Sequence, residues 1–103
     1  MKQLETNIKK AIYTTSLIFD KMPAHRTESI NGIRDELHGA LEYIKIDSSS
    51  IYDAIDAVVN YLEDLDIEIQ TISNEDAEDL TEELKDLVDI IKSQVLEEYW
   101  NGQ

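Results

Sequence analysis

Residues 51–72 read IYDAIDAVVNYLEDLDIEIQTI, and this stretch decides the fold because its pattern is the most regular in the sequence. Apolar side chains recur in it at alternating intervals of four and three residues. They are Ile51, Ile55, Val58, Leu62, Leu65, Ile69 and Ile72. Such spacing, kept over about three heptads, places one apolar stripe along one face of a helix. The stretch is therefore predicted to be an amphipathic helix that packs against other helices.

The end of this stretch carries a second, competing pattern. Residues 65–69 alternate strictly between apolar and acidic side chains, which is typical of a strand, and the β-branched isoleucines there also favour a strand. We expect the helix to continue to about Glu68. Whether residues 65–72 are helix or strand is left open by the sequence.

Two further helices are predicted before residue 51. The first covers about residues 4–22 and ends at Pro23, because proline lacks an N–H and disfavours helix in the residue before it. The second begins near Thr27 or Ser29, since either side chain is a good N-cap, and ends near Ile44. The expected core positions are Leu4, Ile8, Ala11, Ile12, Thr15, Phe19 and Met22, then Ile30, Ile33, Leu37, Ala40, Leu41 and Ile44.

A last helix is predicted to run to about Tyr99. The pairs Ser50 with Asp53 and Ser73 with Asp76 have capping-box spacing, so they are predicted to start the third and fourth helices. The expected core positions of the fourth helix are Ala77, Leu80, Leu84, Leu87, Ile91 and Val95.

The fold class follows from these four segments. The chain has 103 residues, three glycines and one proline, which suits one domain with little of the turn punctuation of an all-β fold. Short connections place successive helices antiparallel. We therefore predict an all-α fold, an antiparallel bundle of about four helices, in a single domain over residues 1–103.

Two glycines inside the second helix allow two interpretations. Gly32 and Gly39 lie seven residues apart, two turns along one side of the helix. Each costs about 1 kcal/mol of helix stability relative to alanine. Either this weakness is tolerated, or a neighbouring helix approaches closely at these positions.

Charge divides the chain into two unlike halves. The sequence has 9 Lys and Arg against 23 Asp and Glu, a formal charge of −14. Residues 1–46, a near-neutral helical hairpin, hold seven basic and six acidic side chains. Residues 47–103, an acidic helical hairpin, hold two basic and seventeen acidic side chains, a net charge of −15. A chain this acidic is repelled by phosphate, so we expect no direct binding to nucleic acid or to an anionic membrane.

The acidic residues of the last helix form a row. Glu75, Asp79, Glu82, Asp86 and Asp89 are spaced four, three, four and three residues apart, which aligns them on one helix face. The third helix adds Asp53, Asp56, Glu63 and Asp64. The row advances by about 5 Å per turn, of the same order as phosphates along a nucleic-acid strand, so it can imitate a backbone. The alternative is a solvated face that only keeps the protein soluble.

Chemistry at an active site is not indicated, and we expect no enzyme, cofactor or metal. There are no cysteines, no nucleophile-base set is visible, and nothing in the sequence places a histidine near the serines at positions 48–50. Asp35, His38 and Glu42 share a helix face and have the spacing that begins a metal site, but a surface ion pair is the simpler interpretation. No apolar run is long enough to span a membrane and no signal peptide is evident, so we expect a cytoplasmic protein.

The segment before the second helix suggests an anion site. His25, Arg26 and Ser29 lie at a helix N-terminus, where backbone N–H groups attract anions. The pattern of Pro23, Arg26 and Ser29 resembles a stretch in small phage proteins that sequester cyclic oligonucleotide signals. That resemblance implies a homo-oligomeric sponge for such a signal.

In size, charge and helicity the chain resembles the small acidic anti-defence proteins of phages and mobile elements that mimic nucleic acid. The resemblance implies a non-enzymatic inhibitor of a host defence system, whose acidic face occludes the nucleic-acid-binding surface of a basic protein or nuclease complex. A third interpretation is a helical structural or immunity-type module. In that case the chain pairs with other copies through Ile51, Ile55, Val58, Leu62, Leu65 and Ile69.

Overall fold

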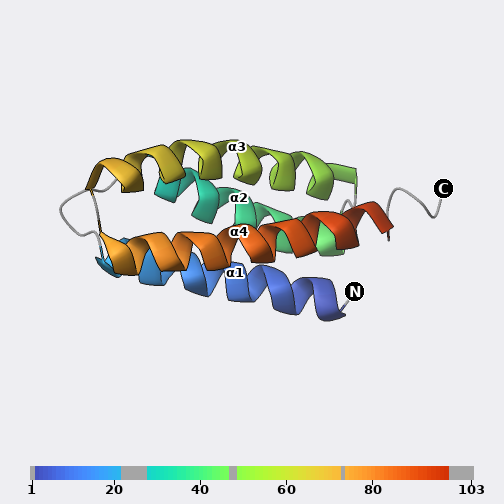
Figure 1. Ribbon diagram of the computed structural model, residues 1–103. Helices are drawn as coiled ribbons and strands as arrows, with labels where there is room; N and C mark the ends of the chain where they lie inside the picture. The colour runs from blue at the N-terminus through green and yellow to red at the C-terminus, as the bar shows by residue number, and fades with distance from the viewer. Residues whose placement is uncertain (1, 22–27, 47–48, 73, 98–103) are drawn as a thin grey trace.

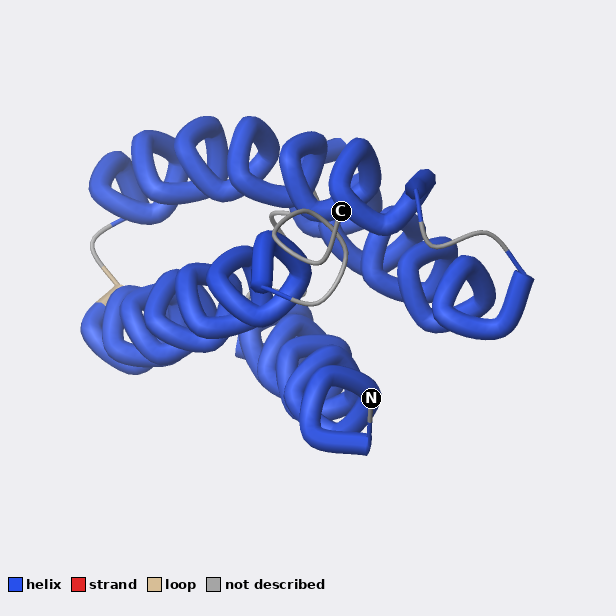
Figure 2. The backbone as a smooth tube through the Cα atoms, turned by 90° about the vertical axis from the view of Figure 1, so that its right-hand side faces the viewer, coloured by secondary structure: helices blue, strands red, loops and turns tan. Residues whose placement is uncertain are grey.

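Four helices make up the described part of the chain. The computed structural model describes residues 2–21, 28–46, 49–72 and 74–97. The helices are α1 (Lys2–Lys21), α2 (Glu28–Ile46), α3 (Ser49–Ile72) and α4 (Glu75–Val95). Figure 1 shows consecutive helices running in opposite directions, and Figure 2 shows helix, with no strand, in each described segment. The prediction of an all-α antiparallel bundle is therefore confirmed.

Each helix packs against two others, so the four helices form a closed ring in cross-section. The neighbouring pairs are α1 with α2, α2 with α3, α3 with α4, and α4 with α1. The bundle measures 44 × 20 × 19 Å. Because α3 and α4 are neighbours, the two acidic helices share one side of the molecule, and the near-neutral α1 and α2 form the other (Figure 1). None of these helices combines the length and the apolarity needed to cross a bilayer.

The core of the first two helices follows the predicted stripe with one displacement. Leu4, Ile8 and Ala11 in α1 are fully buried, as are the predicted positions of α2 up to Ala40. Ile18 is also fully buried, whereas its predicted neighbour Phe19 is half-buried against the core. The same partial burial holds for Ile12, Leu41 and Ile44. Met22 lies outside the described residues.

The helix α3 settles the competing pattern of residues 65–72. It remains helical to Ile72, so the strand alternative is wrong. Leu65 and Ile69 are buried, but Ile67 between them is 65% exposed, whereas a strand would place all three on one face. The helix begins at Ser49, whereas a cap at Ser50 would make residue 51 its first helical residue. The predicted capping box of Ser50 with Asp53 is therefore wrong.

The apolar stripe of α3 is buried in the core of its own bundle. The six side chains considered for pairing between copies are at most 4% exposed, because they pack against neighbouring helices of the same bundle. A second copy would have to open the bundle to reach them. The stripe therefore explains the fold and gives no separate reason to expect an oligomer. The side chain of Ile72 lies outside the described residues.

The start of α4 lies one residue later than predicted. Asn74 is the N-cap, since its Oδ1 accepts a hydrogen bond of 3.1 Å from the backbone N–H of Ala77. Ser73, the predicted cap, lies outside the described residues. The first turn carries three carboxylates, which the positive end of the helix dipole stabilises. The α-helix ends at Val95, and Tyr99 lies outside the described residues.

The buried stripe of α4 differs from the prediction at two positions. Thr81 and Val88 are buried in place of Leu80 and Leu87, which are half-buried. The Thr81 hydroxyl donates a hydrogen bond of 2.7 Å to the carbonyl of Ala77 one turn earlier, so its polar group is satisfied inside the core. A threonine in this stripe is therefore compatible with burial.

Side-chain contacts link each pair of neighbouring helices. The Asn7 amide donates to Gln94 between α1 and α4, at 2.9 Å. The Arg34 guanidinium of α2 lies 5.7 Å from the centre of the Phe19 ring of α1. The other two links are Ser29 to Glu68, between α2 and α3, and Lys85 to Asp66, between α4 and α3.

The two glycines of α2 have different surroundings. A Cβ at Gly32 would lie 2.5 Å from Cζ of the Tyr61 ring, so this side chain of α3 packs directly on the glycine. A Cβ at Gly39 would meet Tyr43 of its own helix at 3.7 Å, an ordinary contact. Gly32 therefore has a packing reason, since the Tyr61 ring of α3 occupies the space that a side chain would need, and tolerated weakness is the better interpretation of Gly39.

Candidate functional site

The predicted row of carboxylates on α4 lies on the outer surface of the bundle. All five side chains, from Glu75 to Asp89, are exposed. The buried stripe of α4 occupies the opposite side of the helix, since its members fall half a turn away from the row. From Glu75 to Asp89 the helix rises by roughly 21 Å. The row therefore runs along about half the length of the bundle.

The carboxylates of α3 divide into an outward set and an interface set. The four predicted partner-binding residues, Asp53, Asp56, Glu63 and Asp64, are exposed. Two other acidic residues of α3 are half-buried because they contact neighbouring helices. Asp66 pairs with Lys85, and Glu68 accepts a hydrogen bond from Ser29. Asp66 and Glu68 therefore contribute to packing between helices as well as to the charge.

The charge of the bundle is strongly one-sided. Together α3 and α4 carry fourteen acidic and two basic side chains, a net charge of −12. In α1 and α2 six acidic and six basic side chains cancel. The two cations on the acidic side are Lys85 and Lys92, and Lys85 is already paired with Asp66 at 3.0 Å. The negative field is consequently directed outward from α3 and α4.

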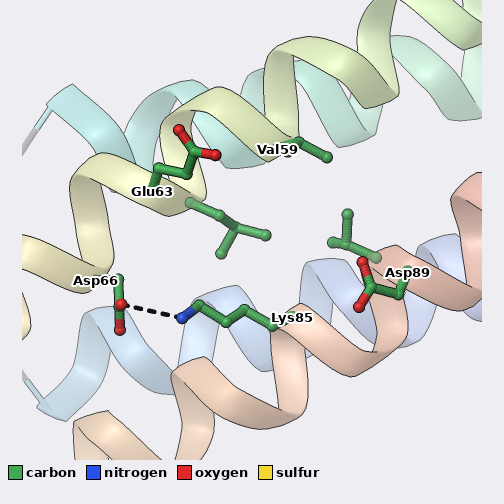
Figure 3. Close-up of a pocket in the computed structure, with 7 residues that line it drawn as sticks. Val59, Glu63, Asp66, Lys85 and Asp89 are labelled. Carbon is green, nitrogen blue, oxygen red and sulfur yellow. Dashed lines mark ion pairs between the residues drawn. The ribbon is translucent and has the colours of Figure 1, made fainter.

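A groove lies between α3 and α4, with carboxylates of both helices along it. It has a volume of about 270 Å³ and is lined by Val59, Leu62, Glu63, Asp66, Lys85, Val88 and Asp89. Figure 3 shows Lys85 reaching toward Asp66, with Asp89 on the same helix and Val59 and Glu63 on the facing helix. The sequence predicted Glu63 and Asp89 as partner-binding residues but did not place them together. Val59 and the pair of Lys85 with Asp66 were not predicted.

The predicted anion site is partly outside the described residues. His25 and Arg26 lie outside the described residues. Ser29 is 5% exposed, and its hydroxyl donates a hydrogen bond of 3.1 Å to Oε1 of Glu68. Its hydroxyl is thus turned toward a carboxylate of α3 rather than presented to a ligand. The second oxygen of Glu68 is buried without a hydrogen-bond partner among the described residues.

Metal-binding geometry is not found in the part of the chain that the structure describes. Within residues 2–21, 28–46, 49–72 and 74–97, no group of three or more histidine or acidic side chains is arranged to hold an ion. Asp35, His38 and Glu42 are exposed on α2.

Comparison of the chain with protein-family models, with curated proteins and with solved structures found no match in any of the three.

Repulsion along the acidic side predicts that salt stabilises the bundle. Neighbouring carboxylates of the α4 row lie three or four residues apart, and each such pair costs a few tenths of a kcal/mol. Raising NaCl from about 0.01 M to 0.5 M shortens the screening length from about 30 Å to under 8 Å. We expect the Tm to rise by about 4–8 °C, which corresponds to roughly 1 kcal/mol.

The measurement is thermal unfolding followed by circular dichroism over this range of salt. The control is a variant in which Glu75, Asp79, Glu82, Asp86 and Asp89 are changed to the matching amides, and its Tm should rise less. A Tm that is constant or that falls with NaCl would contradict the expected repulsion.

Proposed function

We propose that this protein is a non-enzymatic inhibitor that docks its acidic side on a basic, nucleic-acid-binding surface of a partner protein. The partner is proposed to belong to a host defence system, such as a nuclease complex, and the site of action to be the cytoplasm. Bound in this way, the bundle occupies the surface that nucleic acid would otherwise occupy. No reaction is required, because occlusion alone prevents the partner from binding its substrate.

The observation that carries this proposal is the one-sided charge. Nine exposed carboxylates at the predicted positions lie on α3 and α4, and the opposite helices are neutral overall. To keep a small domain soluble, a net charge of magnitude about 2–8 is enough, and the charged residues need not lie on one side. Like charges at helical spacing also oppose folding. If the acidic side binds a partner, this function accounts for both the excess of negative charge and its placement on α3 and α4.

The proposed mechanism is competition aided by electrostatic steering. The basic surface of the partner and the carboxylates of α3 and α4 attract each other over a distance of about one screening length. Complementary charge raises the association rate and aligns the two surfaces before contact. The four-helix scaffold keeps the row of carboxylates in a fixed spacing, so little conformational entropy is lost on binding.

The experiment is capture of basic proteins from a nuclease-containing lysate on the immobilised chain, followed by elution in steps of NaCl. A captured protein is then bound to a labelled DNA or RNA duplex, and the chain is added as a competitor. We expect displacement of the duplex, and an affinity for the partner that falls steeply with salt. Binding that is unchanged between low and high salt would contradict the proposal.

Two variants of equal charge separate the acidic side from the charge of the whole chain. The first carries amides at the five positions of the α4 row. The second carries amides at five acidic positions of α1 and α2, which are Asp20, Glu28, Asp35, Glu36 and Glu42. Exposed ion pairs contribute about 0.2–1 kcal/mol each, so the loss of five in the first variant should weaken binding by about tenfold or more. Equal losses in both variants would show that the acidic side has no special role.

A further inference from the structure

The groove between α3 and α4 combines an apolar floor with charged edges. Val59, Leu62 and Val88 supply the apolar lining. Leu62 and Val88 are almost completely buried, so they lie at the bottom of the groove, and Val59 is half-buried. Carboxylates stand on both sides, Glu63 on α3 and Asp89 on α4 (Figure 3). This combination differs from the rest of the acidic side, which presents carboxylates on a convex helix surface.

The charges around the groove favour a cation. Its lining includes three carboxylates and one ammonium group, a net charge of −2. The ammonium group of Lys85 is paired with Asp66 at 3.0 Å, which leaves Glu63 and Asp89 as the exposed charges at the opening. An anionic or neutral ligand would have to be desolvated against these two carboxylates, whereas a cationic one is attracted by them.

The size and lining of the groove suit the basic side chain of a protein better than a free small-molecule cation. A volume of about 270 Å³ lies below the range of roughly 300–1,000 Å³ typical of small-molecule sites. The apolar floor matches the methylene stem of a long basic residue, which packs along apolar surface while its charged head stays at the edge. Between arginine and lysine, the guanidinium is less strongly hydrated and its planar fork pairs with carboxylates through two hydrogen bonds.

We propose that this groove receives an arginine side chain of the basic partner, with the stem on Val59, Leu62 and Val88 and the guanidinium between Glu63 and Asp89. The proposal rests on the proposed function and adds a short-range anchor to its long-range attraction. Arginines that are held in well-packed pockets commonly dominate the energy of an interface. The groove would therefore set which basic surfaces bind tightly among the many that are attracted.

The test uses the free chain and two small probes of equal charge, N-acetyl-arginine amide and N-acetyl-lysine amide. Methyl NMR spectra are recorded while each probe is titrated. We expect the methyl signals of Val59, Leu62 and Val88 to shift saturably with the arginine probe, at millimolar concentration. The lysine probe should bind more weakly by about threefold or more. Equal shifts with both probes, or no saturable shift at these methyls, would overturn the proposal.

Two double variants of equal charge control for the general field. Glu63→Gln with Asp89→Asn removes the carboxylates at the opening, and we expect the affinity for the arginine probe to fall by about threefold or more. Asp20→Asn with Glu42→Gln removes two exposed carboxylates from α1 and α2, away from the acidic side, and should leave the affinity nearly unchanged. All four positions are exposed, so both variants should fold. Equal losses in the two variants would also overturn the proposal.

The outcomes separate this inference from the proposed function. If the chain captures no basic protein, the proposed function fails whatever the arginine probe does. If a basic protein is captured with steep salt dependence but the probe does not bind the groove, the arginine site alone fails. With a captured partner in hand, Glu63→Gln with Asp89→Asn should weaken the complex more than Asp79→Asn with Asp86→Asn.

Discussion

Leu65→Ala is expected to lower the free energy of unfolding by about 2–5 kcal/mol, the usual cost of truncating a fully buried leucine. Leu65 has no exposed surface, and it lies in the stripe of α3 that packs into the centre of the bundle. Domains of this size are stable by about 5–15 kcal/mol, so the variant loses a large part of its stability. The measurement is urea unfolding followed by circular dichroism.

Ile67→Ala is the matched control because it removes a similar apolar side chain two residues away. Ile67 is 65% exposed, so the free energy of unfolding should change by less than about 0.5 kcal/mol. If Leu65→Ala proves too unstable to measure, Leu65→Met keeps the volume and should cost less than about 1.5 kcal/mol. Equal losses at positions 65 and 67 would contradict the helix and support the alternating strand pattern.

This pair of positions also explains why the sequence predicted most of α3 but left its end open. An alternation over five residues is short, and apolar residues at positions 65 and 69 satisfy a strand and a helix equally well. The choice depends on residue 67, whose isoleucine is apolar but exposed. The helix prevails because the four-three spacing continues from Ile51 and because the rest of the bundle provides helices, not strands, to pack against.

The shift in α4 has a different physical cause. Its sequence offers adjacent apolar residues, such as Leu87 with Val88, so two stripes rotated by one residue are both plausible. The register is chosen by tertiary packing, which single-sequence spacing does not contain. Thr81 can lie in the buried stripe because its hydroxyl donates a hydrogen bond to the backbone carbonyl of Ala77. That hydrogen bond makes a polar residue acceptable in the core.

The acidic side was predictable for a simpler reason. Charged side chains are exposed almost without exception, so helical spacing alone places the α4 row on the surface. The groove was not predictable, because it depends on how α3 and α4 lie against each other. The contact of Lys85 with Asp66 joins residues that are nineteen positions apart in the sequence, and no local pattern marks it.

Gly32→Ala is expected to be less stable than Gly39→Ala by about 1–3 kcal/mol, the usual cost of overpacking. Both substitutions gain about 1 kcal/mol of helix propensity, so this gain cancels in the comparison. The difference arises because a Cβ at Gly32 would lie 2.5 Å from the ring of Tyr61, far inside van der Waals contact. At Gly39 the nearest atom would be at 3.7 Å, so Gly39→Ala should raise the free energy of unfolding above that of the unsubstituted chain.

A double-mutant cycle with Tyr61 tests the cause of this difference. The Tyr61 ring is half-buried against the core, so Tyr61→Ala is itself destabilising, by lost packing. In that background the three ring atoms that would lie nearest the added methyl at position 32 are gone, and Gly32→Ala should become neutral or stabilising. The expected coupling energy is about 1–3 kcal/mol, measured by urea unfolding of the four proteins. If Gly32→Ala costs the same with and without the tyrosine ring, the cost has another origin, and the Tyr61 ring is not what requires glycine at this position.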